Sequence, residues 1–406
     1  MPLELTEQRI SVVDLRIGMF VCRLDRPWEG TPFPLQGLEL AHQDDLDLLR
    51  NLCKFVYIDA HRQLVDYPKP MLTRTNLADS RFERVSHYPE GITFGDELPR
   101  AGQVLADTSE MVDRIYEDVA SGRELSAEYV EQAVRPLVAS VLRNADAFFW
   151  VEGLRERDSY SYGHAIRCSA LAAAFGRHMG FAEETIISLA AGGLLMDVGK
   201  TRLPESLLQY PGTLAPDQMR LARSHVSHGL EIMTGSSITD QDVADIMRTH
   251  HERHDGSGYP DGLSGNAIPI VGRMLGIIDS YDAMTSVRPY RAAISRHRAL
   301  REMYAARNTL FQPELVEQFQ VCLGVYPTGS LVELSTGEVA VVTAQNQVRR
   351  LRPRVLVLST PDKQPLADFR AIDLLHQDLG KGSTDIVRSL AVGEYSMDAA
   401  NLFLSP

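Results

Sequence analysis

Hydrophobic residues between positions 104 and 150 recur at steps of three and four, which is the spacing of an amphipathic α-helix. One series comprises Val104, Leu105, Met111, Val112, Ile115, Tyr116 and Val119, and a second comprises Val130, Ala133, Val134, Leu137, Val138 and Val141. Helical spacing continues over residues 160–180, 183–197, 215–235, 239–251, 270–286, 295–308 and 313–322. The central part of the chain is therefore predicted to be an all-helical bundle.

The two ends of the chain have shorter patterns, which are typical of small units that contain strands. Within residues 8–60, VVDLRIGMFVCRL alternates in part like strands around a glycine turn, HQDDLDLLRNLC has helical spacing, and KFVYIDA returns to strand character. Near the C-terminus, SLVELSTGEVAVVTA predicts two strands with a turn at Ser335 to Gly337, and RVLVLST predicts a third. Residues 61–100 are rich in Pro, Arg, Asp and Ser and predict a linker or mobile loop.

These patterns predict a mainly α protein with three parts. A mixed α/β N-terminal domain with its linker covers residues 1–100, and a helical domain covers residues 101–325, with lead-in helices at 101–150. A small β module with a tail covers residues 326–406. The length of 406 residues suits two or three domains.

Composition narrows the classes of protein that fit. With 41 Lys and Arg against 54 Asp and Glu, the formal charge is −13, which argues against a general nucleic-acid binder because such proteins carry a basic face. The cysteines at 22, 53, 168 and 322 form no C-x-x-C pair, so neither a disulfide framework nor a zinc ribbon is expected. The sequence has no basic-then-apolar leader and no apolar run of the roughly 18 residues that a spanning helix needs. We therefore expect a cytoplasmic protein without a membrane span.

The stretch HHERHDGSGYP, which begins with His250 and His251, carries the strongest chemical signal of the chain. Adjacent residues on a helix point about 100° apart, so two neighbouring histidines can share one metal only near a helix end or an irregular turn. The sequence DGSG at residues 255–258 supplies such a break. Neutral imidazoles combined with a carboxylate suit Fe, Mn, Zn or Ni.

Further polar residues complete an ordered set. His164 lies in YSYGHAIRCSALAAAFG, Asp197 and Lys200 in AGGLLMDVGKTRLP, His225 in LARSHVSHG and Asp279 in GIIDSYDAM. A carboxylate such as Asp197 can bridge two cations, and two metals roughly 3.5–4 Å apart activate a water and clamp a phosphoryl oxygen. Lys200 would offset the charge that builds on a phosphate.

Neighbouring arginines and histidines allow two interpretations. Arg288 and Arg291, in SVRPYRAA, are three residues apart and suit a second phosphate contact, but they could equally pair with the acidic surface. His178, His228 and His254 are expected at the surface or behind the ligands. Any single residue of the ordered set could also be an ordinary half-buried polar group. The whole set, in this order, is difficult to obtain by chance.

This set resembles the HD-GYP family, a branch of the HD phosphohydrolases. The family motif HHExxDGxGYP is matched by His250, His251, Glu252, Asp255, Gly256, Gly258, Tyr259 and Pro260. The likeness extends through LSGNAIPIVGRMLGIIDSYDAMTSVRPYR and covers about residues 150–325. The stretch LRIGMFVCRLDRPWEGTPFPLQG is also similar to the uncharacterised domain that commonly precedes HD-GYP units in bacteria.

The resemblance implies a helical HD-type fold, bacterial second-messenger signalling, and hydrolysis of cyclic di-GMP to pGpG or onward to GMP. It implies bound divalent metals, often iron or manganese, with nickel, magnesium or zinc as alternatives. The implied metal ligands are His164, Asp197, His225, His250, His251 and Asp279. Asp197 and Lys200 would act in catalysis, and Lys200, Arg288 and Arg291 would touch the phosphates. The loop of Gly258, Tyr259 and Pro260 is associated in the family with docking to diguanylate cyclase domains, and a homodimer is a candidate assembly.

Two positions depart from the family pattern. Met196 stands where the histidine of the HD pair is usual, and a thioether is poorly matched to Fe(II), Mn(II) or Mg(II). One metal would then keep Asp197, His225, His250 and His251, and the other would keep only His164, Asp197 and Asp279. Three protein ligands suffice for many catalytic metals, so we expect a weakened site rather than a lost one. Tyr160 replaces the Glu that trinuclear members carry one turn before the first histidine, so at most two metals are expected.

Three functions fit the sequence. The one we favour is a slow, metal-dependent cyclic di-GMP phosphodiesterase, because so many polar residues that are costly to bury persist. The second is a non-catalytic protein that binds the dinucleotide or docks to a cyclase, and Met196 motivates it. The third keeps the hydrolytic chemistry but acts on another nucleotide, such as pGpG.

Overall fold

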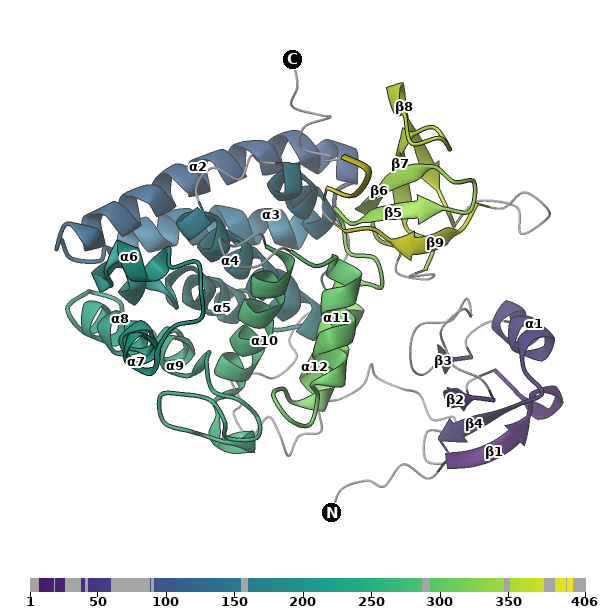
Figure 1. The fold of residues 1–406 in the computed structure, drawn as a ribbon, viewed down its shortest axis with the longest axis horizontal. Helices are drawn as coiled ribbons and strands as arrows, with labels where there is room; N and C mark the ends of the chain where they lie inside the picture. Colours follow the sequence, from purple (N-terminus) through teal and green to yellow (C-terminus); the bar gives the residue numbers. More distant parts are fainter. Residues whose placement is uncertain are drawn as a thin grey trace. The chain divides into compact units, whose positions relative to one another are not determined.

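The protein is described by a computed structural model that covers residues 7–17, 19–25, 38–40, 43–59, 88, 91–154, 160–286, 293–346, 351–375, 384–391 and 393–396. The chain divides into two compact units, Met1–Arg74 and Thr75–Pro406, and each is described by itself. Helices dominate the second unit, and the strands form two small sheets, which confirms the predicted fold class (Figure 1). In the part of the chain described here, no helix is both long and apolar enough to cross a membrane.

The first unit is an antiparallel sheet with one helix. Its strands are β1 (Glu7–Ser11), β2 (Phe20–Leu24), β3 (Leu38–Glu39) and β4 (Phe55–Asp59), in the order β1-β4-β2-β3, and its helix is α1 (Gln43–Leu52). Leu46 and Leu49 of α1 belong to the same core as Val56 of β4. The predicted helix and the strand at KFVYIDA are confirmed. The strand predicted over VVD is wrong, because Ser11 caps a 3-10 turn at Val12–Asp14.

The second unit contains the helical bundle (Figure 1). Its helices are α2 (Phe94–Ala120), α3 (Ala127–Leu154), α4 (Tyr160–Met179), α5 (Glu183–Leu195), α6 (Glu205–Leu208), α7 (Pro216–Arg223), α8 (His225–Thr234), α9 (Gln241–Thr249), α10 (Ile270–Thr285), α11 (Arg296–Ala305) and α12 (Pro313–Leu323). A 3-10 segment, η3 (Val198–Arg202), follows α5. The helix predicted over 215–235 is in fact two helices, because the Ser224 N–H bonds to the Leu221 carbonyl, only three residues back, and ends α7.

The prediction of a linker over 61–100 is wrong at its C-terminal end. Helix α2 begins at Phe94, and the Thr93 hydroxyl caps it by accepting a hydrogen bond from the Asp96 N–H. Gly95 and Pro99, which usually interrupt helices, concealed this start in the sequence. The predicted domain boundary at residue 100 therefore lies inside α2, and most of 61–90 lies outside the described residues.

Helix α4 lies in the middle of the bundle and packs against α2, α3, α5, α10 and α12. Leu171 and Phe175, predicted to face the core from the helix that carries His164, are both buried. Helices α5 and α9 and helices α9 and α10 also pack directly against one another. The segments that carry the ordered polar set are therefore neighbours in the fold.

Glycines at two close contacts bring the polar residues of different segments together. A Cβ added to Gly193 of α5 would lie 2.9 Å from the backbone of α4, and one added to Gly276 of α10 would lie 2.9 Å from the carbonyl oxygen of His250. Only glycine allows backbones to approach this closely. Asp197 and Asp279 follow these two glycines by about one helical turn. The close contacts therefore hold both carboxylates near the histidines of adjacent segments.

The C-terminal module is a five-stranded antiparallel sheet in the order β8-β7-β6-β5-β9. Its strands are β5 (Leu331–Leu334), β6 (Val339–Ala344), β7 (Arg354–Ser359), β8 (Pro365–Asp373) and β9 (Ile386–Ser389). The three predicted strands and the turn at Ser335–Gly337 are confirmed. Strands β8 and β9 were not predicted, because their largely exposed side chains lack a hydrophobic alternation. Trp150 of α3 packs in the core under β5 and β6 and attaches the module to the bundle.

Candidate metal centre

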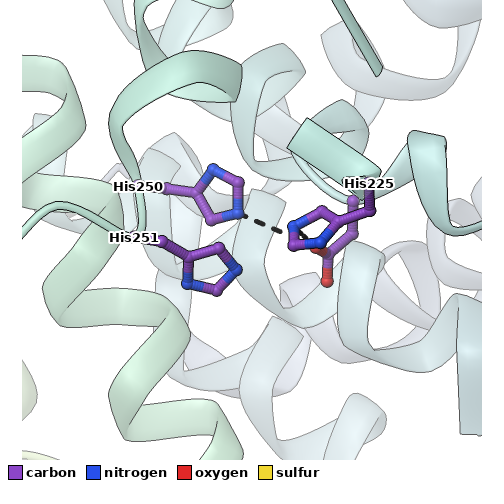
Figure 2. A group of neighbouring side chains, drawn as sticks. His225, His250 and His251 are labelled. Carbon is purple, nitrogen blue, oxygen red and sulfur yellow. Dashed lines mark ion pairs between the residues drawn. The ribbon is translucent and has the colours of Figure 1, made fainter. Parts of the chain in front are cut away.

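Three histidines and one aspartate come together beside the end of α5. His225 is the first residue of α8, His250 caps the C-terminus of α9, and His251 lies in the following turn. Figure 2 shows the three imidazoles gathered around a common space. Asp197 Oδ1 lies 3.4 Å from His225 Nε2 and 3.7 Å from His250 Nε2. We call these four residues the trihistidine cluster; their ligand atoms all lie within 4.8 Å of one another.

Local backbone geometry explains why this cluster can form. Because α9 ends at Thr249, His250 and His251 leave the regular helix and can point to the same place, which two adjacent helical residues could not do. Gly199 of η3 lies directly against α8, where an added Cβ would overlap the carbonyl oxygen of His225. This contact keeps Asp197, two residues earlier, next to His225.

Hydrogen bonds behind two of the rings determine which nitrogen faces the cluster. His225 Nδ1 lies 2.7 Å from the carbonyl oxygen of Ala222, and His250 Nδ1 lies 3.1 Å from those of Ile246 and Met247. A carbonyl accepts but does not donate, so Nδ1 carries the proton and Nε2 keeps its lone pair. This is the usual arrangement behind a histidine that binds a metal.

The donor atoms of the trihistidine cluster fit a cation. His225 Nε2, His250 Nε2 and Asp197 Oδ1 are buried and have no hydrogen-bond partner among the described residues. An unsatisfied buried polar atom costs about 1–3 kcal/mol, and three such atoms within one small space are therefore unfavourable without a shared partner. A divalent cation is a partner that accepts lone pairs from all three. Imidazole nitrogens with a carboxylate oxygen suit Fe, Mn, Ni or Zn.

A second group of donors lies on the other side of Asp197. His164 Nε2 lies 3.4 Å from Asp197 Oδ2 and 3.4 Å from Asp279 Oδ1. We call His164, Asp197 and Asp279 the His164 cluster; its ligand atoms also lie within 4.8 Å of one another. His251 Nδ1 lies 3.7 Å from Asp279 Oδ2, so the two clusters are contiguous. Asp197 belongs to both and is placed to bridge them.

Side chains behind the His164 cluster orient its histidine. His164 Nδ1 bonds to Asp282 Oδ2 at 2.6 Å, and Arg167 Nε donates to Asp282 Oδ1 at 2.5 Å. Glu152 lies 3.5 Å from Arg167 and continues the chain of charges toward α3. The carboxylate of Asp282 thus fixes the ring so that Nε2 faces Asp197 and Asp279.

Cys168 lies close to His164 but does not complete a separate cation site. Its sulfur is 3.6 Å from His164 Nδ1, and His164, Cys168 and Asp282 could in principle hold a metal together. However, Asp282 already accepts from Arg167 and bonds to His164 Nδ1, so its oxygens are occupied. Burial raises the pKa of the Cys168 thiol to about 11, so the sulfur is neutral near pH 7. We interpret this group as support for His164.

The electrostatics of the two clusters favour added positive charge. Burial lowers the pKa of His225 to about 4 and also holds the pKa of His251 well below its usual value, so both rings are neutral near pH 7. Burial alone would raise the pKa of Asp197 and Asp279, but nearby cationic groups, Lys200 and His164 respectively foremost, outweigh it and lower both. Two buried carboxylates that stay ionised provide the charge that a divalent cation needs.

The other predicted site residues have different positions. Lys200 forms an ion pair with Asp197, three residues earlier. Met196 is buried at the C-terminal end of α5, directly before Asp197. Arg288 and Arg291, predicted to touch phosphates, lie outside the described residues.

The loop that follows the paired histidines folds back over the cluster. Glu252 is buried and accepts hydrogen bonds from the backbone N–H groups of Asp261 (2.8 Å) and Leu263 (3.0 Å). Gly258 lies against the backbone of Glu252, where an added Cβ would overlap it. The Tyr259 ring stacks on His251 with centroids 4.6 Å apart and an interplanar angle of 27°. The loop predicted to dock a partner therefore places its tyrosine on a histidine of the cluster, while Pro260 is exposed.

Sequence reasoning missed the supporting residues Asp282, Arg167 and Glu152. The signal for Asp282 was its spacing, because residues three apart share a helical face and Asp282 is three after Asp279. Arg167 is likewise three after His164. Nothing in the sequence links Glu152 of α3 to either of them.

Comparisons with known proteins were consistent with this geometry. The family model described as HD domain matches residues 152–315, and a domain of unknown function, DUF3391, matches residues 7–130. The chain is 32% identical over 370 residues to the cyclic di-GMP phosphodiesterase PA4108 of Pseudomonas aeruginosa, which covers 90% of this chain and 89% of that protein. This chain belongs to the HD-GYP family of HD domain phosphodiesterases. Both resemblances inferred from the sequence, for the HD-GYP region and for its N-terminal neighbour, are confirmed.

This HD-GYP protein is also similar to a phosphodiesterase whose name states another substrate and to one solved structure. The 3'3'-cGAMP-specific phosphodiesterase 2 of Vibrio cholerae is 36% identical over 164 residues, which are 40% of this chain and 31% of that protein. The solved structure of Bd1817, a HDG"Y"P protein from Bdellovibrio bacteriovorus, covers 77% of this chain and 98% of its own, with a TM-score of 0.46 and 17% identity.

Proposed function

We propose that this HD-GYP protein is a metal-dependent phosphodiesterase that hydrolyses cyclic di-GMP to pGpG, GMP or both in bacterial second-messenger signalling. The observation that supports this most is the pair of contiguous donor clusters that share Asp197. Two clusters joined by one carboxylate are the arrangement expected of a two-metal hydrolytic centre. The metal ligands we propose are those of the two clusters, His164, Asp197, His225, His250, His251 and Asp279.

The residues in and around the two clusters would have different roles in hydrolysis of the phosphodiester. Two divalent cations, when bound, would polarise a phosphoryl oxygen and activate the attacking water. Asp197 would bind both and hold them close together. Lys200 is exposed enough to exchange its partner Asp197 for a phosphate oxygen and would stabilise charge there. His164 and Asp279 would define the second position, supported by Asp282.

We propose iron or manganese as the metals, in two positions. Both clusters combine imidazole nitrogen with carboxylate oxygen, and neither requires a thiolate, which argues against a structural zinc of the Cys-rich kind. The His164 cluster offers only three residues, which leaves coordination positions for water or substrate.

Cyclic di-GMP is the substrate we propose because PA4108, which is named a cyclic di-GMP phosphodiesterase, matches nearly the whole chain. The cGAMP-specific relative matches only the catalytic part, at 40% of the chain. The two molecules differ in one base, so their distinction must come from contacts outside the metal clusters. Cleavage of pGpG alone is the remaining alternative.

The decisive experiment is anaerobic purification followed by loading with Fe(II) or Mn(II) and incubation with cyclic di-GMP, 3'3'-cGAMP and pGpG side by side. We expect cyclic di-GMP to be cleaved fastest and Asp197→Asn to be slower by roughly a thousandfold on every substrate. Faster cleavage of cGAMP or of pGpG would reassign the substrate within the same chemistry. Intact cyclic di-GMP after hours with either metal would contradict the proposal itself.

A second candidate function is regulation through binding of the dinucleotide without cleavage, and Met196 is the observation that favours it. Its side chain is buried at the position next to Asp197 where the family usually has a metal-binding histidine. Met196→His would test this directly. If the methionine limits the enzyme, bound metal per chain and turnover should both rise in this variant. Turnover should rise about tenfold if the added ligand contributes about 1.4 kcal/mol. Binding of cyclic di-GMP by both variants with turnover by neither would favour the regulatory function.

A further inference from the structure

Arg223 is a cation at the edge of the trihistidine cluster that the proposed mechanism does not use. It is the last residue of α7, lies two positions before His225, and its side chain is exposed. Three other cations near the two clusters have carboxylate partners: Lys200 pairs with Asp197, Arg167 with Asp282 and Arg248 with Asp261. Arg253 donates instead to the backbone carbonyls of His250 and Glu252. Within the described residues, Arg223 forms no ion pair, and its guanidinium lies over the ring of Tyr259 instead, 4.6 Å from the ring centre.

The Tyr259 ring connects Arg223 to the cluster. One face of the ring stacks on His251, with centroids 4.6 Å apart, and the ring meets His225 edge-on at 6.4 Å. Tyr259 therefore contacts both Arg223, an exposed cation, and His251, a proposed metal ligand of the trihistidine cluster.

This mode of attachment leaves the guanidinium able to bind an anion. The contact with the Tyr259 ring uses no carboxylate or carbonyl acceptor, so the N–H donors of the guanidinium stay available to an anion. Those donors match two oxygens of one phosphate in a bidentate pair. A cyclic dinucleotide carries two phosphodiesters, of which only one is attacked at a time. The other needs a cation of its own on a chain with a formal charge of −13.

We propose that Arg223 is a substrate-binding residue, whose guanidinium binds the non-bridging oxygens of the phosphodiester that is not being cleaved while Tyr259 holds it in place. This inference rests on the proposed function. It concerns binding of the ground state, so it affects KM more than kcat. Lysine would keep the charge but lose the planar fork, and glutamine would lose both.

The test compares Arg223→Gln with a matched control on the same helix. Arg220 is 75% exposed and pairs with Asp217 in the same turn of α7, so Arg220→Gln also removes one exposed positive charge, from a residue with a carboxylate partner. For Arg223→Gln we expect KM for cyclic di-GMP to rise about tenfold, with kcat changed less than about twofold, because a charge-assisted hydrogen bond is lost. Arg223→Lys should be intermediate, and Arg220→Gln should match the unmodified protein.

Two readouts besides turnover separate substrate binding from a structural role. Bound metal per chain, measured by elemental analysis, should be equal in all four proteins. The rise of KM with salt should be shallower in Arg223→Gln, since one ionic contact to the substrate is missing. An unchanged KM in Arg223→Gln, or a loss of metal or kcat in place of KM, would overturn the inference while the proposed function stands. Absence of cleavage of any cyclic dinucleotide by the unmodified protein would overturn both.

Discussion

The trihistidine cluster and the His164 cluster share Asp197 but are held in place by different kinds of group. In the trihistidine cluster, backbone carbonyls of Ala222, Ile246 and Met247 orient His225 and His250. In the His164 cluster, the carboxylate of Asp282 orients the ring, and Arg167 in turn orients Asp282. The first cluster offers four residues and the second three.

This difference has consequences for how firmly each cluster would bind a cation. Backbone carbonyls are positioned by α7 and α9 themselves, so no single side-chain change removes them. A carboxylate behind a histidine makes the ring a stronger ligand, but the support disappears with one substitution. We therefore expect the His164 cluster, with fewer donors and substitutable support, to lose its metal first. By the family pattern, the histidine that Met196 replaces would be a ligand of this same cluster.

The change with the largest expected effect removes the residue that both clusters share. Asp197→Asn should lower bound metal from two equivalents toward none and reduce turnover roughly a thousandfold, since the metals supply several kcal/mol of transition-state stabilisation. Elemental analysis and the rate of cyclic di-GMP cleavage measure the two effects. Asp217→Asn, on the exposed surface of α7, is the control and should change neither. Retention of one full metal by Asp197→Asn would show that the clusters do not depend on a shared carboxylate.

A smaller and more selective effect is expected from the support behind His164. Asp282→Asn should weaken metal binding about 10- to 100-fold at the His164 cluster alone, because second-layer carboxylates contribute on that scale. A titration with a chelator should then remove one equivalent early and leave the other at the concentration seen for the unmodified protein. Parallel thermal melts check that the fold survives the change. Loss of both equivalents at the same chelator concentration would contradict the expected difference in metal affinity between the two clusters.

Much of the candidate site could be predicted because its residues occur in a rare order with sharp local signals. His250 and His251 can share one metal only where a helix ends, and the sequence DGSG predicted such an end close to them. The glycines at 193, 199 and 276 are where the backbones meet, but a glycine in a sequence does not say which segment it touches. The convergence of Asp197 on His225 was therefore known only through the resemblance to the family.

The parts of the molecule that escaped prediction lack such local signals. Strand β8 is exposed over most of its length and is held by pairing with β7, a contact that depends on distant residues. The start of α2 was hidden by Gly95 and Pro99, although tertiary contacts of Leu105 and Val112 support the helix further along. Asp282 is one of two aspartates in α10, and its bonds to His164 and Arg167 show that it supports the cluster, which its place in the sequence does not.

A third change, outside both clusters, tests whether effects on the metals are specific. Glu97 of α2 is fully buried and accepts hydrogen bonds from Ser140 Oγ (2.8 Å) and from Arg143 Nε and Nη2 (2.7 Å each) on α3. Burial alone would raise the pKa of Glu97, but Arg143 and Ser140 outweigh it and hold the pKa below 4.5. Glu97→Gln should lower the free energy of unfolding by about 1–3 kcal/mol, since a hydrogen-bonded charge is lost.

The pH dependence of that loss follows from the direction of the pKa. A carboxylate with a lowered pKa in the folded state contributes its stability above the ordinary Glu value of 4.5, and the contribution disappears as the pH falls through the lower folded value. Denaturant titrations should therefore show the full difference between Glu97→Gln and the unmodified protein at pH 7 and a shrinking difference below pH 4.5. Metal content and turnover at pH 7 should stay the same. A loss of metal in Glu97→Gln would mean that weakening the α2–α3 contact also weakens metal binding at the clusters. The metal loss in Asp282→Asn would then reflect general destabilisation and not the support of one histidine.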